Sequence, residues 1–504
     1  MTAALQLLAM VTMFLVTFLI FQALGGRRET LLYSRADKEE WNRRIGTRLG
    51  SWFTLTSILG TLTSLATVYL FFIGNSRYFG AWILVCVAAI WGGAFVTNGF
   101  TRRICLAEHV RRILESNDQV GGVIASIFWR PTREGRATAR IVKYLSLANI
   151  LALIWLDFAL FADISTSLLG LSSRVSPGLA GLGRPDLRMS MLLLICSAFA
   201  VIFFTLRYGL RGVIFADLFQ SPMILLGTSV VFVGCIIALA RHAGHDLTFS
   251  LLLPKASLFN GIVFALHVCC VNMALVLVTE THWLRLWIFR KREIEMQVRS
   301  IACTAGLWLL LIFIGFAAFP LSNGKVGEAA VQGLLQALAM LSPLLVVAFW
   351  IGGTAALFAS ADVQIYALLV VNEFDLKTGI LRSKTMSTIR PFRDALVSSL
   401  LFGVAYYFVR LADIPFEKLV FLILPISLNL LPAFVRAARS LPQLPSLLLL
   451  SLGLYLFCLV VGLSQPRLEF GWTLMAAVMP CIVACIALIP MRRSPMEMVK
   501  TNDA

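Results

Sequence analysis

Long apolar runs, each about 20 residues or more, are the feature that most constrains what this chain can fold into. A helix needs roughly 20 mainly apolar residues to cross the hydrocarbon layer of a bilayer. Because lipid offers the backbone no hydrogen-bond partners, such runs must be helical. Only 14% of the 504 residues are charged, against about 25% in soluble proteins. The sequence therefore predicts an all-α membrane protein with about thirteen transmembrane helices.

The runs are joined by polar connections and leave no room for a soluble domain. The first run lacks a basic start and a small-residue cleavage motif, so we interpret it as a helix and not as a signal peptide. The longest polar stretch, residues 101–143, is expected to be a loop with a short amphipathic helix. The expected spans are 3–25, 51–73, 79–100, 144–166, 188–206, 212–240, 257–278, 300–321, 343–371, 394–412, 416–435, 444–463 and 470–491.

The distribution of Lys and Arg predicts the orientation. Cytoplasmic loops of membrane proteins are enriched in these residues, and most of the 43 here fall on one side if the N-terminus is outside. The C-terminus is then cytoplasmic, and we expect a multi-pass protein of the plasma (inner) membrane, surrounded by lipid. The net charge of +17 is spread over separate short loops, whereas nucleic-acid binding needs a basic face. The sequence therefore predicts no nucleic-acid partner.

Cysteines and catalytic motifs suggest no further chemistry. Nine of the ten cysteines lie in expected spans and Cys105 lies in an inner loop, so we expect apolar fillers and no disulfide. There is no P-loop glycine pattern, no His-Glu-x-x-His and no Gly-x-Ser-x-Gly. We expect neither an ATP-driven pump nor an enzyme.

Polar residues inside spans are costly in a bilayer and are candidates for function. Span 51–73 is rich in Ser and Thr, which suits close helix packing or a helix that unwinds to expose carbonyls to an ion. Span 343–371 contains Gly352-Gly353-Thr354 and Ser360-Ala361-Asp362. Asp362 is either an interfacial charge or, deeper in the span, a functional one. Asp157 is an intramembrane carboxylate with no partner nearby in the sequence.

One segment resembles a signature of the sodium:solute symporter family. Residues 205–220 contain Gly209-Leu210-Arg211, followed by Asp217 and Gln220, which are similar to that family's turn at the start of its sixth helix. Three further segments are similar in order and spacing to family segments: Gly46–Trp52, Thr281–Trp283 with the basic stretch after it, and Phe358–Asp362.

The resemblance implies a LeuT-type core of two inverted five-helix repeats, formed by spans two to six and seven to eleven. We expect a single transporter domain over residues 1–504. Within it, a peripheral first helix and inner loop span 1–50, the first repeat 51–240 and the second repeat 257–437. Two peripheral helices span 444–491. Solute and sodium would meet between broken helices two and seven.

The resemblance also implies a sodium site between spans two and nine. Carbonyls of Thr61, Ser64 and Ala356 would be ligands, together with side chains at positions 359 and 360. Ser360 has the expected hydroxyl, whereas Ala359 lacks it. Thr354, Thr63 or water would have to compensate, so the sequence weakens the expectation of tight sodium coupling.

Solute contacts are expected around the broken seventh helix. Asn272 would be a polar contact, with Met273 and Leu277 as apolar lining and Thr63 on span two. His267 and His282 would either relay protons or bond neighbouring carbonyls, the second being the commoner role. We expect Glu280 to be a solvated charge at the inner face.

The leading hypothesis is a secondary transporter that moves a small organic solute, such as an amino acid or carboxylate, with an ion. Two alternatives remain open. One is a transporter-derived sensor or partner subunit without sodium coupling, whose basic 101–143 loop would dock a cytoplasmic partner. The other is a proton-coupled carrier that uses Asp157 or His267.

Overall fold

The computed structural model describes most of the chain as helices. The described residues are 2–20, 22, 75–107, 110, 124–168, 185–242, 258–289, 293–324, 328–379, 390–412, 414, 416–465 and 470–489. Expected span 51–73 lies outside them, as do its candidate residues Thr61, Thr63 and Ser64.

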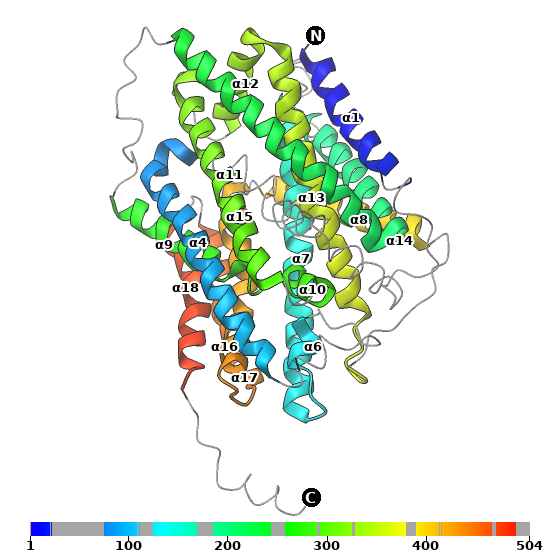
Figure 1. Cartoon of the computed structure of the whole chain (residues 1–504), viewed down its shortest axis with the longest axis vertical. Coiled ribbons are helices and arrows are strands. Elements are labelled where there is room, and N and C mark those ends of the chain that lie inside the picture. Colours follow the sequence, from blue (N-terminus) through cyan, green and yellow to red (C-terminus); the bar gives the residue numbers. More distant parts are fainter. Residues whose placement is uncertain are drawn as a thin grey trace, which may run out of the picture.

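The helices form one bundle (Figure 1). In the view of Figure 1, α1 and α12 lie at the upper end, and α6, α16 and α17 at the lower end. The elements are α1 (Thr2–Ile20), α4 (Asn75–Leu106), α6 (Ile124–Phe128), α7 (Arg133–Leu168), α8 (Pro185–His242), α9 (Leu258–Leu275), α10 (Glu280–Phe289), α11 (Glu293–Leu321), α12 (Glu328–Leu341), α13 (Pro343–Glu373), α14 (Arg390–Leu411), α15 (Phe416–Ile423), the 3₁₀ segment η6 (Leu424–Leu430), α16 (Leu431–Ala438), α17 (Pro445–Ser464) and α18 (Phe470–Ile486).

Ten stretches of helix among the described residues are long and apolar enough to cross a membrane. They run from Gly80–Leu106 to Pro445–Ser464 and coincide with the expected spans from 79–100 to 444–463. Shorter apolar helices, Val11–Ile20 and Gly471–Ile486, fall within the first and last expected spans. The prediction of an all-α multi-pass membrane protein is confirmed, with about thirteen spans as an approximate count. The sequence did not predict α12, which packs between α11 and α13.

Two breaks interrupt the long helices. Helix α8 contains two spans that meet at Gly209, whose φ of 60° and ψ of −157° are not helical. Glycine adopts positive φ without the clash that a Cβ would cause, so the Gly209-Leu210-Arg211 step marks the bend between spans five and six. The expected seventh span is also broken: α9 ends at Leu275 and α10 begins at Glu280.

Helix α13 lies at the centre of the bundle. It contacts α8, α7, α1 and α12, and most of its residues between Val346 and Val371 are buried. A helix that is apolar on all sides is expected to be enclosed by others. Gly227 of α8 and Gly352 of α13 meet so closely that a Cβ on Gly227 would lie 2.9 Å from the Gly352 Cα. These glycines let α8 and α13 pack at backbone contact.

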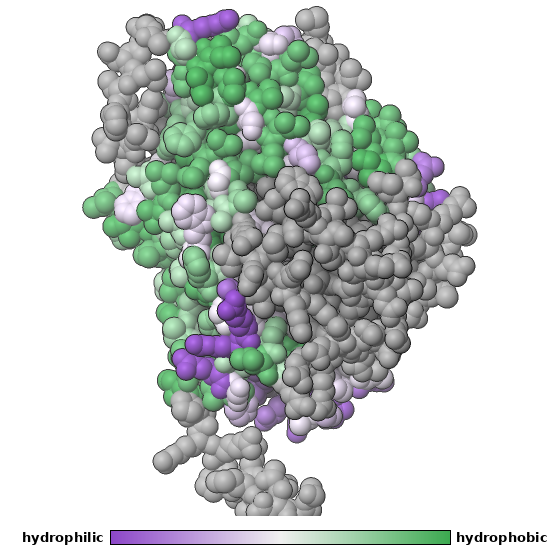
Figure 2. Space-filling model, viewed as in Figure 1, coloured by the Kyte–Doolittle hydropathy of each residue, from purple (hydrophilic) through white to green (hydrophobic). Residues whose placement is uncertain are grey.

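The outer helices present an apolar surface. On α14 and α17, Leu401, Phe408, Phe457 and Val460 are 60–65% exposed. Figure 2 shows a largely hydrophobic face over the described helices, with hydrophilic residues mostly toward the lower end and a few at the upper and right edges. A soluble protein does not leave so much apolar surface uncovered, and this surface is suited to contact with lipid.

Candidate functional site

One polar cluster joins α13 to α7. The Ser360 hydroxyl donates a 2.8 Å hydrogen bond to Asp157 Oδ2, and Gln364 Nε2 donates to Ser360 Oγ at 3.1 Å. Their exposed fractions are 0% for Ser360, 3% for Asp157 and 8% for Gln364. Ser360, the hydroxyl residue expected to bind sodium on span nine, is thus a partner of Asp157 that the sequence did not reveal. Gln364 was not predicted, although its i+4 spacing from Ser360 on a helix places the two on one face.

A second cluster joins α13 to α8. Asp362 is fully buried, and the side chains of Asp217 and Gln220 lie beside its carboxylate. Neither Asp362 oxygen has a well-aligned hydrogen bond among the described residues. Asp362 is therefore not a solvent-exposed charge, and its burial against α8 favours the alternative of a functional residue. Two neighbouring carboxylates in a low-dielectric interior are costly unless a cation or a proton lies with them.

The remaining span-nine candidates lie in apolar surroundings. Ala356 and Ala359 are at most 1% exposed and belong to a small cluster with Met13, Ile224 and Leu307. A methyl group at position 359 therefore fits its surroundings. Thr354, which would have to compensate for it, is fully buried, and its hydroxyl has no hydrogen-bond partner among the described residues.

The expected solute contacts flank the break between α9 and α10. Asn272 is 8% exposed, Leu277 is 1% exposed and Met273 is 41% exposed. Helix α4 passes close by, since a Cβ on Gly93 would lie 2.7 Å from the Asn272 carbonyl oxygen. Trp283 Nε1 donates a 2.8 Å hydrogen bond to the Leu277 carbonyl, so an indole from α10 satisfies a backbone group that the break leaves out of the helix.

Both histidines bond neighbouring helices. His267 Nδ1 donates to the Thr473 carbonyl of α18 at 2.8 Å, and His282 Nε2 lies 3.1 Å from the Thr101 hydroxyl of α4. Both rings are buried. These contacts favour the structural role over the proton relay.

The expectation that Glu280 is a solvated charge is wrong. Glu280 is 3% exposed, and its Oε2 accepts a 2.8 Å hydrogen bond from the backbone N–H of Ile124. The sequence misleads here because α6, far away along the chain, folds over the carboxylate.

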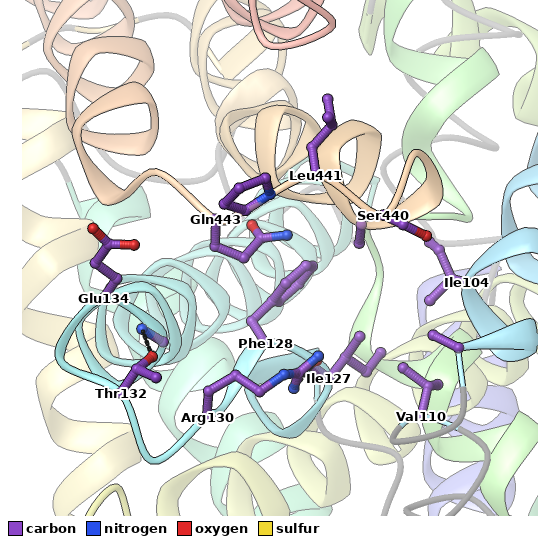
Figure 3. A pocket seen from close by; sticks show the side chains of 14 residues that line it. Ile104, Val110, Ile127, Phe128, Arg130, Thr132, Glu134, Ser440, Leu441 and Gln443 are labelled. Carbon is purple, nitrogen blue, oxygen red and sulfur yellow. Dashed lines mark hydrogen bonds between the residues drawn. The ribbon is translucent and has the colours of Figure 1, made fainter. Parts of the chain in front are cut away.

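Two cavities lie on the connections at the lower end. The first, of about 450 Å³, is lined by residues of α4, α6, the start of α7 and the α16–α17 turn (Figure 3). Arg130 borders it and donates to the Ile127 and Trp129 carbonyls at 3.2 and 2.6 Å; burial lowers its pKa. The second, of about 530 Å³, surrounds Lys143 and the end of α13. Neither is lined by an expected sodium or solute residue.

The overall arrangement is similar to that of a solved transporter. A Na⁺-coupled sialic acid symporter in a substrate-bound outward-open state is similar over 97% of this chain and 99% of its own, with a TM-score of 0.58 and 13% identity. A weaker similarity, with a TM-score of 0.43 and 15% identity, extends over 88% of this chain and 99% of MhsT in complex with L-phenylalanine. No protein-family model matches the sequence, and no curated protein matches it. The chain therefore has the LeuT-type fold that the resemblance implied, at a sequence identity that defines the fold alone.

Proposed function

We propose that this protein is a secondary transporter that moves a small organic solute across the membrane by alternating access, coupled to sodium. The observation that supports it most is the pair of buried acidic clusters on α13, within a fold that matches a Na⁺-coupled symporter along its whole length. Charged groups inside a membrane protein are expensive and mark ion or solute pathways. The N-terminus would be outside and the C-terminus cytoplasmic.

The cation would lie beside α13. Ser360 is the hydroxyl ligand in this proposal, Ala356 and the span-two residues Thr61 and Ser64 would supply carbonyls, and Asp157 would favour positive charge through Ser360. Hard oxygen ligands of this kind suit a hard cation. With an alanine at 359, the negative charge of Asp157 would compensate for the missing hydroxyl.

The solute would bind at the break between α9 and α10. Asn272 and Leu277 are buried there, and Met273 and the span-two residue Thr63 complete the proposed lining. We propose an organic acid or amino acid, because the similar structure is that of a Na⁺-coupled sialic acid symporter. The two proposed repeats, 51–240 and 257–437, would move against each other around this position.

Ligand-dependent thermal stability tests the proposal. A ligand that binds only the folded protein raises its melting temperature, so a panel of amino acids and carboxylates is screened with sodium and with potassium. We expect a solute whose stabilisation requires sodium. Ser360→Ala should weaken the apparent sodium affinity by about tenfold, the equivalent of about one lost hydrogen bond to a cation or charged group, whereas Thr304→Ala, a buried hydroxyl that bonds within its own helix, should not.

A sensor without transport is the second candidate, favoured by Ala359 and by the bond that already engages Ser360. Solute binding that is indifferent to sodium, with no uptake into vesicles, would support it. Binding that depends on pH in place of sodium would indicate the proton-coupled carrier. The cytoplasmic partner of the 101–143 loop remains a prediction.

A further inference from the structure

A buried carboxylate fastens the broken seventh span to the connection between α4 and α7. Glu280 is the first residue of α10, and Ile124 is the first residue of α6. The hydrogen bond from Ile124 N to Glu280 Oε2 measures 2.8 Å and joins positions 156 residues apart. Glu280 is 3% exposed and Ile124 fully buried, so water does not compete for this bond in the present conformation.

Neighbouring contacts hold the same end of α10. The Ser146 side chain of α7 lies beside Glu280. His282 pairs with Thr101 of α4, and the Trp283 ring stacks on Phe434 of α16 at 5.6 Å between centroids. Helix α10 therefore meets four separate elements within its first turn, and Glu280 is its link to α6.

Only one oxygen of the Glu280 carboxylate has a well-aligned hydrogen bond in this arrangement. Its second oxygen, Oε1, is buried and has no well-aligned hydrogen bond among the described residues, although the Ser146 side chain lies beside the carboxylate. A carboxylate has about four acceptor positions, and leaving them empty in the interior opposes burial. Water would satisfy them if α10 moved away from α6. A conformation in which water reaches this carboxylate would therefore compete with the contact between α10 and α6.

We propose that Glu280 is a positioning residue that latches the α6 end of the solute pathway shut, and that its release of the Ile124 N–H accompanies opening at that end. The inference rests on the proposed transport function. The break at residues 276–279 separates α10 from the expected solute contacts on α9, and such breaks let one helical segment move while the other stays packed. The positive-inside rule places the α6 end in the cytoplasm, so the latch would control release into the cell.

Two variants separate the hydrogen-bond acceptor from the charge. Glu280→Gln keeps a carbonyl oxygen that can accept from Ile124, whereas Glu280→Ala leaves the N–H without an acceptor. Both variants are neutral, so the comparison isolates the latch. Ile124→Pro removes the donor from the other side, at the first position of a helix, where proline is tolerated. Glu134→Ala, an exposed glutamate at the start of α7, is the matched control.

Hydrogen–deuterium exchange of the full-length protein in lipid nanodiscs reports the latch directly. We expect the amides of residues 124–128 to exchange about tenfold faster in Glu280→Ala than in Glu280→Gln, as an unmet buried N–H would cause. Glu134→Ala should match the wild type. Equal exchange in the Ala and Gln variants would overturn the latch.

Sided measurements in proteoliposomes test the gating role. If Glu280→Ala favours the conformation open at the α6 end, the apparent solute affinity should weaken when solute is added at the opposite end. The apparent affinity for solute added at the α6 end should be kept. Glu280→Gln should restore the wild-type affinities, and Ile124→Pro should show the same change as Glu280→Ala. Equal loss of affinity on both sides would contradict gating. Faster exchange in a protein that moves no solute would contradict the proposed transport and leave the latch intact.

Discussion

Asp157 and Ser360 lie 203 positions apart in the sequence, on α7 and α13. Their hydrogen bond places a negative charge beside a hydroxyl on the central helix. In water such a hydrogen bond contributes little to stability. In a low-dielectric interior, however, a carboxylate attracts a nearby cation strongly. In the proposed transporter, the charge of Asp157 would therefore matter more to cation binding than to folding.

Asp157→Asn removes the negative charge but keeps nearly the same side-chain shape, and so tests the role of the charge. The amide oxygen can still accept from Ser360, so the fold should be kept, whereas the apparent sodium affinity should fall by about tenfold as one negative charge is lost. Sodium-dependent melting temperature measures the change. Asp394→Asn, at a partly exposed carboxylate on α14, should leave the sodium affinity unaltered. An equal loss of affinity in this control would contradict a specific role of Asp157 in sodium binding.

A second buried acid, Asp163, serves a different purpose. It accepts hydrogen bonds from Tyr406 and forms an ion pair with Arg410, and these links join α7 to α14. The sequence analysis did not single out this group, because its partners lie more than 240 residues away. Removing one partner from a buried pair leaves an uncompensated charge.

Arg410→Met should therefore lower the free energy of unfolding by about 1–3 kcal/mol, below the full cost of a buried pair because the arginine is partly exposed. Adding Asp163→Asn to that variant should recover part of the loss, since no charge then remains unpaired. Chemical or thermal unfolding in detergent measures both. A double variant whose loss of unfolding free energy exceeds the sum of the losses in the two single variants would contradict this account.

At the scale of elements, basic side chains satisfy the carbonyls that helix ends leave free. Lys143 donates to the Asn372 and Phe374 carbonyls at the end of α13 at 2.9 and 2.7 Å. Lys418 donates to the carbonyls of Leu463 and Gln465 at the C-terminal end of α17. A cation at a helix C-terminus also interacts favourably with the helix dipole. Some of the net positive charge thus caps helices, besides supporting the expected orientation in the membrane.

Lys143→Met should uncap α13 and destabilise the protein by about 1 kcal/mol. Arg140→Met, an exposed residue one turn earlier on the same helix, is the control and should have an effect within about 0.5 kcal/mol. Melting temperatures of the two purified variants decide between capping and a general effect of lost charge, which would lower both equally.

Helix α8 is held against α13 by close backbone contact. A Cβ on Gly227 would lie 2.7 Å from the Ala348 carbonyl oxygen, which no ordinary contact permits. Gly227→Ala should therefore push the two helices apart and destabilise the protein by about 1–3 kcal/mol. On α4, Gly92 has nothing within 4 Å of its missing Cβ, and Gly92→Ala should be neutral or slightly stabilising. Equal melting temperatures for both variants would refute the close packing.

At the scale of the whole molecule, the spans could be predicted because membrane insertion depends on the length and apolarity of local segments. The match of the expected ranges with Gly80–Leu106 through Pro445–Ser464 follows from length and apolarity alone. The bend at Gly209 was also recognisable, since its motif is continuous in sequence. Helix α12 escaped prediction because an amphipathic connection has no such signal.

The contacts within the candidate site could not be predicted in the same way. Asp157 was identified as a costly intramembrane charge, and Asp362 as either an interfacial or a functional one, but the neighbours of both side chains come from other helices and depend on packing. Glu280 was misjudged because the sequence places it among arginines, whereas α6 buries it. Local patterns define which residues are unusual, and tertiary structure defines what they bond.

Solute uptake into proteoliposomes under an inward sodium gradient tests the central claim most directly. With the solute identified by thermal stability, we predict accumulation above equilibrium that stops when sodium is replaced by potassium or when the gradient is collapsed. Ser360→Ala should need about tenfold more sodium for half-maximal uptake. Binding of the solute without uptake, under sodium and proton gradients alike, would contradict the account.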